Sequence, residues 1–135
     1  MNQVSIISQA QADELYRRLP KRSKFIFALG IETGLRVSDI LRLKIGDIEN
    51  PMSVYVGRIN AVRAYKLSEW LYTQLLDYAN LRPSQHYIFT SRRKYQRHLH
   101  RTTYHRDIKQ AVAGLDFSAS AHSTRKFFLQ LISDK

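Results

Sequence analysis

Helical spacing dominates the pattern of apolar residues along the chain. The first stripe consists of Ala12, Leu15, Tyr16 and Leu19. Residues three and four positions apart share one helix face, so this stripe predicts a helix with Ser8 as its cap and Pro20 as its stop. Residues 25–31 are apolar on every side. That favours a helix buried in the core, although the pattern alone also allows a buried strand.

Two shorter helical segments follow, each with its own boundary signal. Gly34 is a natural end for the buried helix, and residues 37–41 begin a short helix with apolar positions of their own. Ser68 predicts the start of another helix, which ends before Pro83.

The last two predicted helices lie in the final third of the chain. Thr102 or Thr103 can cap the first of them, and Gly114 closes it. The second begins near His122. Its predicted core face consists of Phe127, Phe128, Leu131 and Ile132.

Strand character is confined to the middle of the chain. Residues 52–56 and 62–66 predict an antiparallel hairpin, and residues 87–90 predict another short strand. Residues 91–101 are interpreted as a basic loop. The predicted fold is therefore mainly α with a small antiparallel β-hairpin or sheet (α+β), in one domain.

The chain carries twice as many cationic as anionic side chains. It has 135 residues, 44% of them apolar, with 22 Lys and Arg against 11 Asp and Glu and a net charge of +11. The length and apolar content predict one folded domain with its own core. The charge predicts a nucleic-acid partner, because each phosphate that Lys or Arg neutralises releases a condensed counterion. An anionic lipid surface is the alternative, but no amphipathic anchor or lipidation signal supports it.

Several classes of site are excluded by what the sequence lacks. The absence of cysteine rules out disulfides, a thiol nucleophile and thiolate metal ligands. No carboxylate or cysteine completes a metal site with His98, His100 and His105, so no metal or other cofactor is expected. No apolar run reaches the roughly 18 residues of a membrane span, and the N-terminus lacks a signal-peptide pattern. We therefore expect no membrane partner and a cytoplasmic location.

Two motifs far apart in the sequence contain residues suited to gripping a phosphate. Arg36 follows Gly34 between two predicted helices, and its planar fork can make two parallel bonds to a phosphate. His122 and Arg125 are three residues apart on a predicted helix and therefore face the same way. The simpler alternatives are a solvated histidine and ordinary surface arginines, with Arg36 pairing to Glu32 or Asp39.

The segment 91–101 is the densest positive stretch of the chain. Its cationic residues include Arg92, Arg93, Lys94 and Arg97, with Tyr95 interleaved. Such a segment suits contact with a nucleic-acid backbone, which positions the partner without reading its sequence. The alternative is a solvated loop.

The two motifs, taken together and in this order, resemble the two arginine boxes of the tyrosine recombinases, the phage integrase family. The string ETGLRVSDILRLKIGDI resembles the first box, and HSTRKFF resembles the H-x-x-R box with the aromatic residues that follow it. Between them, SVYVGRINAVRAYKLSEWL and YIFTSRR stand in the family's order as a hairpin and a strand. The resemblance extends from about Ser8 to the end of the chain.

The resemblance implies an activity on double-stranded DNA. These enzymes transfer a phosphodiester to a tyrosine and then rejoin the strand to another, without ATP or metal. By position, Arg36 and Arg125 would neutralise the non-bridging oxygens in the transition state, and His122 would hydrogen-bond the phosphate and assist proton transfer. Because recombinases act as multimers on paired sites, the resemblance also implies a homo-oligomer on DNA.

Two departures from the family pattern affect this expectation. The family's hairpin lysine, which protonates the departing 5′ oxygen, is replaced by Arg58, a poor proton donor; Lys66, at the end of the second strand, is the alternative. The family tyrosine lies on helices beyond the H-x-x-R helix, whereas Lys135 is the last residue given. We therefore expect a catalytic domain that ends before the nucleophile helix and forms no phosphotyrosine by itself.

The DNA-clamping domain that precedes the catalytic domain in this family is also expected to be missing. Binding should then be weak and strongly salt-dependent. Three functions remain open at this point. The chain is an integrase or recombinase domain, a DNA-binding regulator without cleavage, or a helix-turn-helix protein with GLRVSDILRLK as the recognition helix and the hairpin as a wing.

Overall fold

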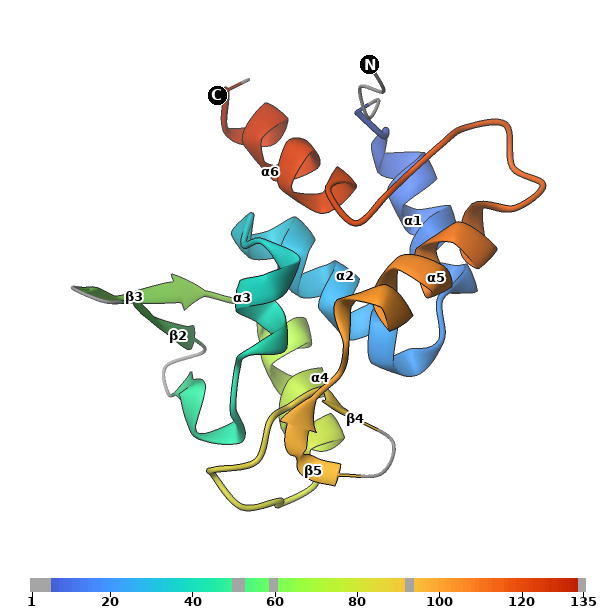
Figure 1. Ribbon diagram of the computed structural model, residues 1–135. Helices are drawn as coiled ribbons and strands as arrows, with labels where there is room; N and C mark the ends of the chain where they lie inside the picture. Colours follow the sequence, from blue (N-terminus) through green and yellow to red (C-terminus); the bar gives the residue numbers. More distant parts are fainter. Residues whose placement is uncertain (1–5, 50–52, 59–60, 92–93, 134–135) are drawn as a thin grey trace.

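The computed structural model describes residues 6–49, 53–58, 61–91 and 94–133 (Figure 1). The helices are α1 (Gln9–Arg18), α2 (Lys21–Thr33), α3 (Val37–Leu41), the 3-10 helix η1 (Ile45–Asp47), α4 (Glu69–Ala79), α5 (Arg101–Val112) and α6 (Ser123–Ser133). The strands are β1 (Ile48–Glu49), β2 (Ser53–Arg58), β3 (Ala61–Lys66), β4 (Thr90–Ser91) and β5 (Lys94–His98). The predicted fold class, mainly α with small antiparallel sheets, is confirmed.

Helix α2 is the centre of the molecule, and α1, α4, α5 and α6 pack against it (Figure 1). It is buried along residues 25–30, which confirms the helical interpretation of that apolar run. It begins directly after Pro20 and ends at Gly34, whose φ of 72° is the left-handed conformation that favours glycine. Ser8 caps α1 as predicted.

The β2–β3 hairpin projects from the helical body (Figure 1). Its antiparallel register runs from the pair Ser53↔Lys66 at the base to Arg58↔Ala61 at the far end, and β1 adds a short edge to β2. Val54 and Leu67 are buried and attach the base of the hairpin to the core. The predicted hairpin is confirmed.

The described part of the basic segment forms strands rather than the predicted loop, and that prediction was wrong. Strand β5 pairs with β4 through Thr90↔His98, and the Leu99 N–H donates to Phe89 O at 2.8 Å. The backbone of this segment therefore finds its hydrogen bonds in a two-stranded sheet.

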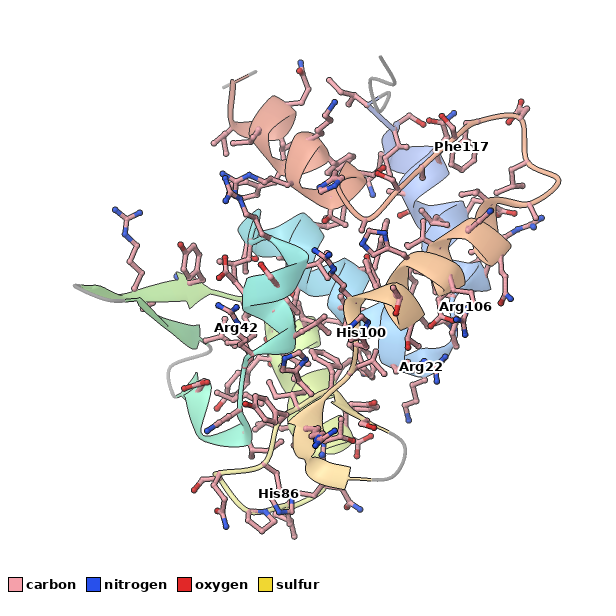
Figure 2. All side chains as sticks on the ribbon, viewed as in Figure 1. Arg22, Arg42, His86, His100, Arg106 and Phe117 are labelled. Carbon is pink, nitrogen blue, oxygen red and sulfur yellow. The ribbon has the colours of Figure 1, made fainter. Side chains whose placement is uncertain are left out.

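The start of the following helix also differs from the prediction. The cap of α5 is His100, whose Nδ1 accepts from the Thr102 N–H at 3.2 Å, rather than Thr102 or Thr103 (Figure 2). A histidine ring nitrogen can replace the usual hydroxyl because it too accepts a backbone hydrogen bond.

The predicted core face of α6 is only partly correct. Phe127 is buried, but Leu131 and Ile132 are 47% and 48% exposed, and Thr124 is buried in their place. The reason lies in the length of α2. Helix α6 contacts α2 near Gly30 and Gly34, and because α2 ends there, the last turn of α6 runs past it.

A polar cluster joins α2 to α5 inside the helical body. The guanidinium of Arg22 donates to both carboxylate oxygens of Asp107 at 3.1 and 3.2 Å, and the buried Ser23 hydroxyl donates to the same carboxylate (Figure 2). Asp107 is itself buried, so its charge depends on these partners. The cluster fixes α5 beside α2, on which α6 also packs.

Candidate functional site

A cleft of about 560 Å³ lies between the turn before α3, helix α5 and the start of α6. Its lining comprises Leu35, Arg36, Val37, Ser38, Arg101, His105, Ala121, His122, Arg125, Lys126 and Leu129. Every ionisable side chain in this lining is basic. The cleft therefore has the charge and the hydrogen-bond donors to hold an anion.

Arg36 is positioned by a tight turn between α2 and α3. Leu35 is buried in the core while its neighbour Arg36 is exposed, so the turn directs the arginine into the cleft. The Thr33 hydroxyl donates to Leu29 O at 2.6 Å and accepts from the Leu35 N–H at 3.1 Å. These bonds satisfy the backbone of the turn and hold it in one conformation.

Arg125 reaches the cleft from α6 and is held by the same turn. Its Nη1 donates to the backbone oxygen of Gly34 at 2.9 Å. The two motif arginines are thus linked through two residues of backbone, although they are 89 positions apart in the sequence. Both line one cleft.

The close contact between α2 and α6 depends on two glycines. A Cβ on Gly30 would lie 2.4 Å from Thr124 Oγ1, and a Cβ on Gly34 would lie 2.2 Å from Phe128. No side chain fits at either position without a shift. The sequence signal for this packing is a matched spacing. Gly30 and Gly34 are four positions apart, and so are their contacts Thr124 and Phe128 on α6.

The cleft contains basic residues that motif analysis did not identify. His105 and Arg101 lie one turn apart on α5, and Lys126 lies beside Arg125 on α6. Burial lowers the pKa of His105, and the neighbouring charges of His122 and Arg101 lower it further. Their helical spacing of four could have placed Arg101 and His105 on one face, but the sequence does not show that this face meets α6.

His122 immediately precedes α6 and is exposed at the cleft. Its backbone is held at both ends: the N–H donates to Ser120 Oγ at 3.2 Å, and the carbonyl accepts from the Lys126 N–H at 3.2 Å. The ring thus projects from the first turn of the helix that also carries Arg125.

The other predicted site residues lie outside this cleft or outside the described part of the chain. Lys66 is exposed at the end of β3, and Arg97 is exposed on β5. Arg58 is the last residue of β2 and Lys94 the first of β5, but their side chains are outside the description. Arg92 and Arg93 lie outside the described residues.

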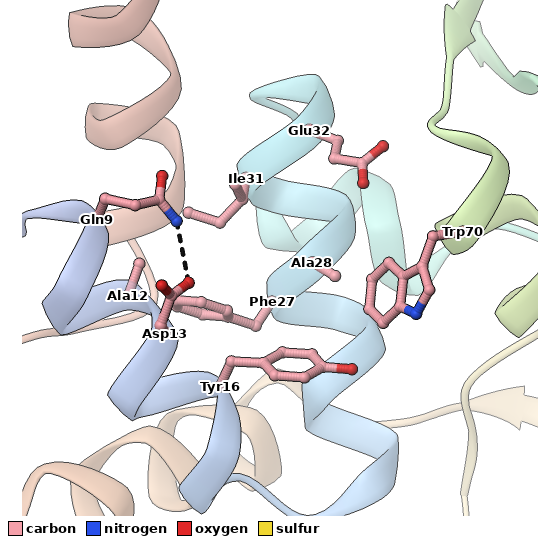
Figure 3. Close-up of a pocket in the computed structure, with 9 residues that line it drawn as sticks. All are labelled: Gln9, Ala12, Asp13, Tyr16, Phe27, Ala28, Ile31, Glu32 and Trp70. Atoms are coloured by element: carbon pink, nitrogen blue, oxygen red, sulfur yellow. Dashed lines mark hydrogen bonds between the residues drawn. The ribbon is translucent and has the colours of Figure 1, made fainter.

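A second pocket, of about 310 Å³, lies between α1, α2 and the start of α4 (Figure 3). Apolar and aromatic side chains such as Tyr16, Phe27 and Trp70 dominate its walls. Its charged residues are the carboxylates Asp13 and Glu32, which repel an anion. The basic cleft is therefore the candidate site for a phosphate.

The described ranges contain neither a metal site nor a membrane-spanning helix. Among those residues, no three His, Asp or Glu side chains are grouped in a way that could hold a metal ion. Nor does any helix in the described part have the length and hydropathy needed to cross a membrane.

Comparison with known proteins gives consistent matches over almost the whole chain. The profile of the "Phage integrase family" matches residues 2–134. The protein named "Probable integrase/recombinase YoeC" from Bacillus subtilis (strain 168) is 30% identical over 112 residues, which are 80% of this chain.

Solved structures show the same fold. The XerA recombinase matches 97% of the chain with a TM-score of 0.78 and 24% identity. The catalytic core of lambda integrase matches 96% with a TM-score of 0.74 and 21% identity. The Tn1549 transposon integrase, solved with circular intermediate DNA, matches 99% with a TM-score of 0.78 and 14% identity.

The chain corresponds to only part of several of these proteins. It spans 61% of YoeC, 52% of the XerA chain and 54% of the Tn1549 integrase chain. It spans 84% of the lambda catalytic core.

Proposed function

The chain belongs to the phage integrase family, and from this membership and the geometry of the cleft we propose that it binds double-stranded DNA and takes part in strand cleavage and rejoining. One observation carries the proposal. Arg36 and Arg125 line the same cleft, whose ionisable side chains are all basic, and are joined through the Gly34 turn. Two guanidinium groups on one rigid support suit a phosphodiester better than two independent surface arginines.

In the proposed reaction the two arginines bind the non-bridging oxygens of the scissile phosphate. Negative charge accumulates on these oxygens as phosphorus becomes pentacoordinate, and fixed cations stabilise that state without having to reorganise. His122 donates a hydrogen bond to the same phosphate and assists proton transfer. The tyrosine hydroxyl loses its proton as its oxygen bonds to phosphorus, the bond to the 5′ oxygen breaks, and that oxygen gains a proton and leaves as a hydroxyl. Rejoining reverses these changes.

We further propose that the nucleophilic tyrosine comes from outside the residues that line the cleft. Within the described lining there is no tyrosine. Tyr104, on α5, is fully buried, and burial together with the charge of Asp107 raises its pKa. Its hydroxyl is thus neither accessible nor easily ionised. A segment beyond residue 135 or a partner chain would supply the tyrosine.

The hairpin residues Arg58 and Lys66 would assist at the leaving oxygen. Arg58 can neutralise charge there but hardly gives up its proton, whereas Lys66 can serve as a proton donor. The basic segment, with Arg92, Arg93, Lys94 and Arg97, would contact the DNA backbone. Lambda integrase has been solved as a tetramer on a Holliday junction; by analogy we propose that this chain also assembles on DNA.

Covalent capture tests this function directly. The chain is incubated with nicked duplex DNA carrying its attachment site, alone and together with a relative that contains the tyrosine segment, and adducts are resolved on a denaturing gel. We expect no adduct from the chain alone and cleavage when the tyrosine is supplied. Arg125→Ala should reduce that cleavage by about 10²–10³-fold, whereas Arg106→Ala, an exposed arginine on α5 outside the cleft lining, should leave it unchanged.

A DNA-binding regulator without cleavage is the second candidate function. The absence of tyrosine from the described cleft lining favours it. Salt-sensitive DNA binding that depends on Arg125, without cleavage under either condition, would identify this function. The structure does not support the helix-turn-helix alternative, because α3 has only five residues and the whole fold matches recombinase catalytic domains.

A further inference from the structure

A charged pair of hydrogen bonds joins the end of α2 to the start of α4. Glu32 Oε1 accepts from the Ser68 backbone N–H at 2.7 Å, and Glu32 Oε2 accepts from the Ser68 hydroxyl at 2.7 Å. Figure 3 shows the Glu32 carboxylate directed to the side of α2 on which Trp70 and α4 lie. The Glu32 carboxylate is therefore bonded to Ser68, whereas its position in the sequence had suggested an ion pair with Arg36.

The link completes a helix cap that the local sequence leaves unfinished. In a capping box, the hydroxyl of the cap accepts from the backbone three residues on, and a Glu or Gln at that position returns a bond to the cap. Ser8 and Gln11 form such a box locally on α1. On α4, Ser68 Oγ accepts from the Leu71 N–H at 3.1 Å, but Leu71 cannot return the bond. Glu32 returns it from another helix.

The Ser68 cap connects the hairpin to the cleft by its position in the chain. Ser68 follows the last residue of β3, Lys66, by two positions, and Glu32 precedes Arg36 by four positions, in the last turn of α2. The link thus ties the base of the hairpin to the helix whose end presents Arg36. Leu67 is buried at the same joint, but apolar packing has no preferred direction, whereas two hydrogen bonds to one carboxylate define an orientation.

We propose that Glu32 is a positioning residue for the DNA-binding site. It holds the hairpin base, and with it Lys66, at a fixed place relative to Arg36 and Arg125, so that cations from both regions meet one DNA backbone. The inference rests on the proposed function, because it assigns DNA to the cleft. It assigns a role to the first residue of the ETGLRVSDILRLKIGDI string, whose side chain bonds to Ser68 and lies outside the lining of the cleft.

A coupling experiment tests the role of Glu32. Affinity for a short labelled duplex is measured as a function of salt for Lys66→Ala and for Arg125→Ala, each in the wild-type and in the Glu32→Ala background. In the wild-type background, Lys66→Ala should reduce the salt slope by about 1. In the Glu32→Ala background the effect of Lys66→Ala should shrink, while Arg125→Ala should weaken binding by the same factor in both backgrounds.

Hydrogen exchange shows whether the joint itself has changed. Glu32→Ala and Ser68→Ala should each accelerate exchange of the amides in residues 61–71 by about fivefold, the loss expected for one helix cap. Exchange in residues 124–128 of α6 should be unchanged. The variant that combines Glu32→Ala with Ser68→Ala should exchange little faster than either single variant. Glu32→Gln keeps a carbonyl acceptor for the Ser68 N–H and should retain most of the protection. The matched control is Glu69→Ala, which removes an exposed carboxylate from the first turn of α4 without touching the link.

The outcomes separate this inference from the proposed function. Equal effects of Lys66→Ala in both backgrounds, or unchanged exchange at 61–71 in folded Glu32→Ala, would overturn the positioning role. An Arg125→Ala variant that binds DNA as tightly as the wild type would overturn the proposed function instead. Circular dichroism of each variant establishes that a loss of binding does not reflect unfolding.

Discussion

The α2–α6 contact and the β2–β3 hairpin both place cations at the candidate DNA-binding surface, but they are held in different ways. Helix α6 lies so close to α2 that glycine is required at two contact points, Gly30 and Gly34. The hairpin is held by its backbone register, by the buried Val54 and Leu67 at its base, and by the bonds between Glu32 and Ser68.

The difference separates two requirements of a phosphate site. Groups that stabilise a transition state must be held to within about 0.5 Å, and interlocked helices provide that accuracy for Arg125. Groups that neutralise the DNA backbone nearby need only the correct charge at the correct distance, because their contribution comes largely from counterion release. The hairpin meets the second requirement with fewer fixed contacts.

The largest expected effect comes from breaking the interlocked contact. Gly34→Ala brings a Cβ to 2.2 Å from Phe128 and imposes an unfavourable φ of 72°. Overpacking and left-handed strain together should lower the free energy of unfolding by about 3 kcal/mol. Gly30→Ala, which meets Thr124 without the conformational strain, should cost about 2 kcal/mol. Chemical denaturation measures both losses.

Gly114 provides the matched control for these two glycines. Its φ is 81°, but nothing lies within 4 Å of the position its Cβ would occupy. Gly114→Ala should therefore cost only the strain, about 1 kcal/mol. A cost for Gly30→Ala no larger than that of Gly114→Ala would show that α6 moves away from α2 easily, and the contrast with the hairpin would disappear.

A conservative change of the cation tests which region needs exact geometry. Arg125→Lys keeps the charge but removes the fork that bonds to Gly34 O while facing the cleft. Lysine lacks the planar fork with which arginine can bond to the carbonyl and to a phosphate at once, so DNA affinity should fall by about fivefold, equivalent to about 1 kcal/mol. Arg97→Lys, at an exposed position of β5, should bind as the wild type does. Titration of both variants with one labelled duplex makes the comparison, and equal losses would contradict it.

Tyr104 tests whether a buried hydroxyl in the helical body has a hydrogen-bond partner. Its buried hydroxyl has no hydrogen-bond partner among the described residues. Tyr104→Phe removes a polar group that gains nothing from its surroundings, so the free energy of unfolding should rise, by up to about 1 kcal/mol. Thermal and chemical denaturation measure the change. A loss of stability would indicate that the hydroxyl has a partner, such as an internal water.

The smallest expected effect concerns the pH dependence of the cleft. The pKa of His105 in the free protein lies below its ordinary value of about 6.5, because of burial and then the charges of His122 and Arg101. The unfolded chain therefore binds the proton more readily, and stability should fall as the pH drops through about 6.5. A bound phosphate favours the protonated ring, so DNA affinity should rise over the same range.

His105→Gln should reduce both the loss of stability and the gain of DNA affinity at low pH. The rise in DNA affinity between pH 7.5 and 5.5 should be smaller in this variant, because glutamine cannot become a cation beside the bound phosphate. Binding isotherms at several pH values and constant ionic strength test this. An unchanged pH profile would assign the proton linkage to other groups, and His100→Gln, at the cap of α5 outside the cleft lining, serves as the control.

Much of this arrangement could be predicted from local patterns. Helical spacing and caps located α1 to α4, and strand alternation located the hairpin, because these features depend on neighbouring residues. The two motifs also identified Arg36, His122 and Arg125 as members of one site. Their convergence could be inferred from the order of the motifs and the resemblance to a family, rather than from the physics of either segment alone.

The remaining features depend on contacts between distant segments. The exposure of Leu131 follows from the point at which α2 ends, and the cap of α4 depends on Glu32, 36 residues earlier. His105 joins the cleft because α5 packs beside α2, where Arg22 bonds to Asp107. Sequence periodicity reports which face of an element is apolar, but it does not report which other element that face will meet.

The acceptor that holds Arg125 is a main-chain oxygen, and this affects how the site responds to inherited change. Every amino acid that could occupy position 34 has a main-chain carbonyl group, so no missense mutation can delete the partner of the Arg125 guanidinium. A mutation can only displace that oxygen by changing the turn around it. The tolerance of this position should therefore follow the volume and φ preference of the new residue, not its polarity.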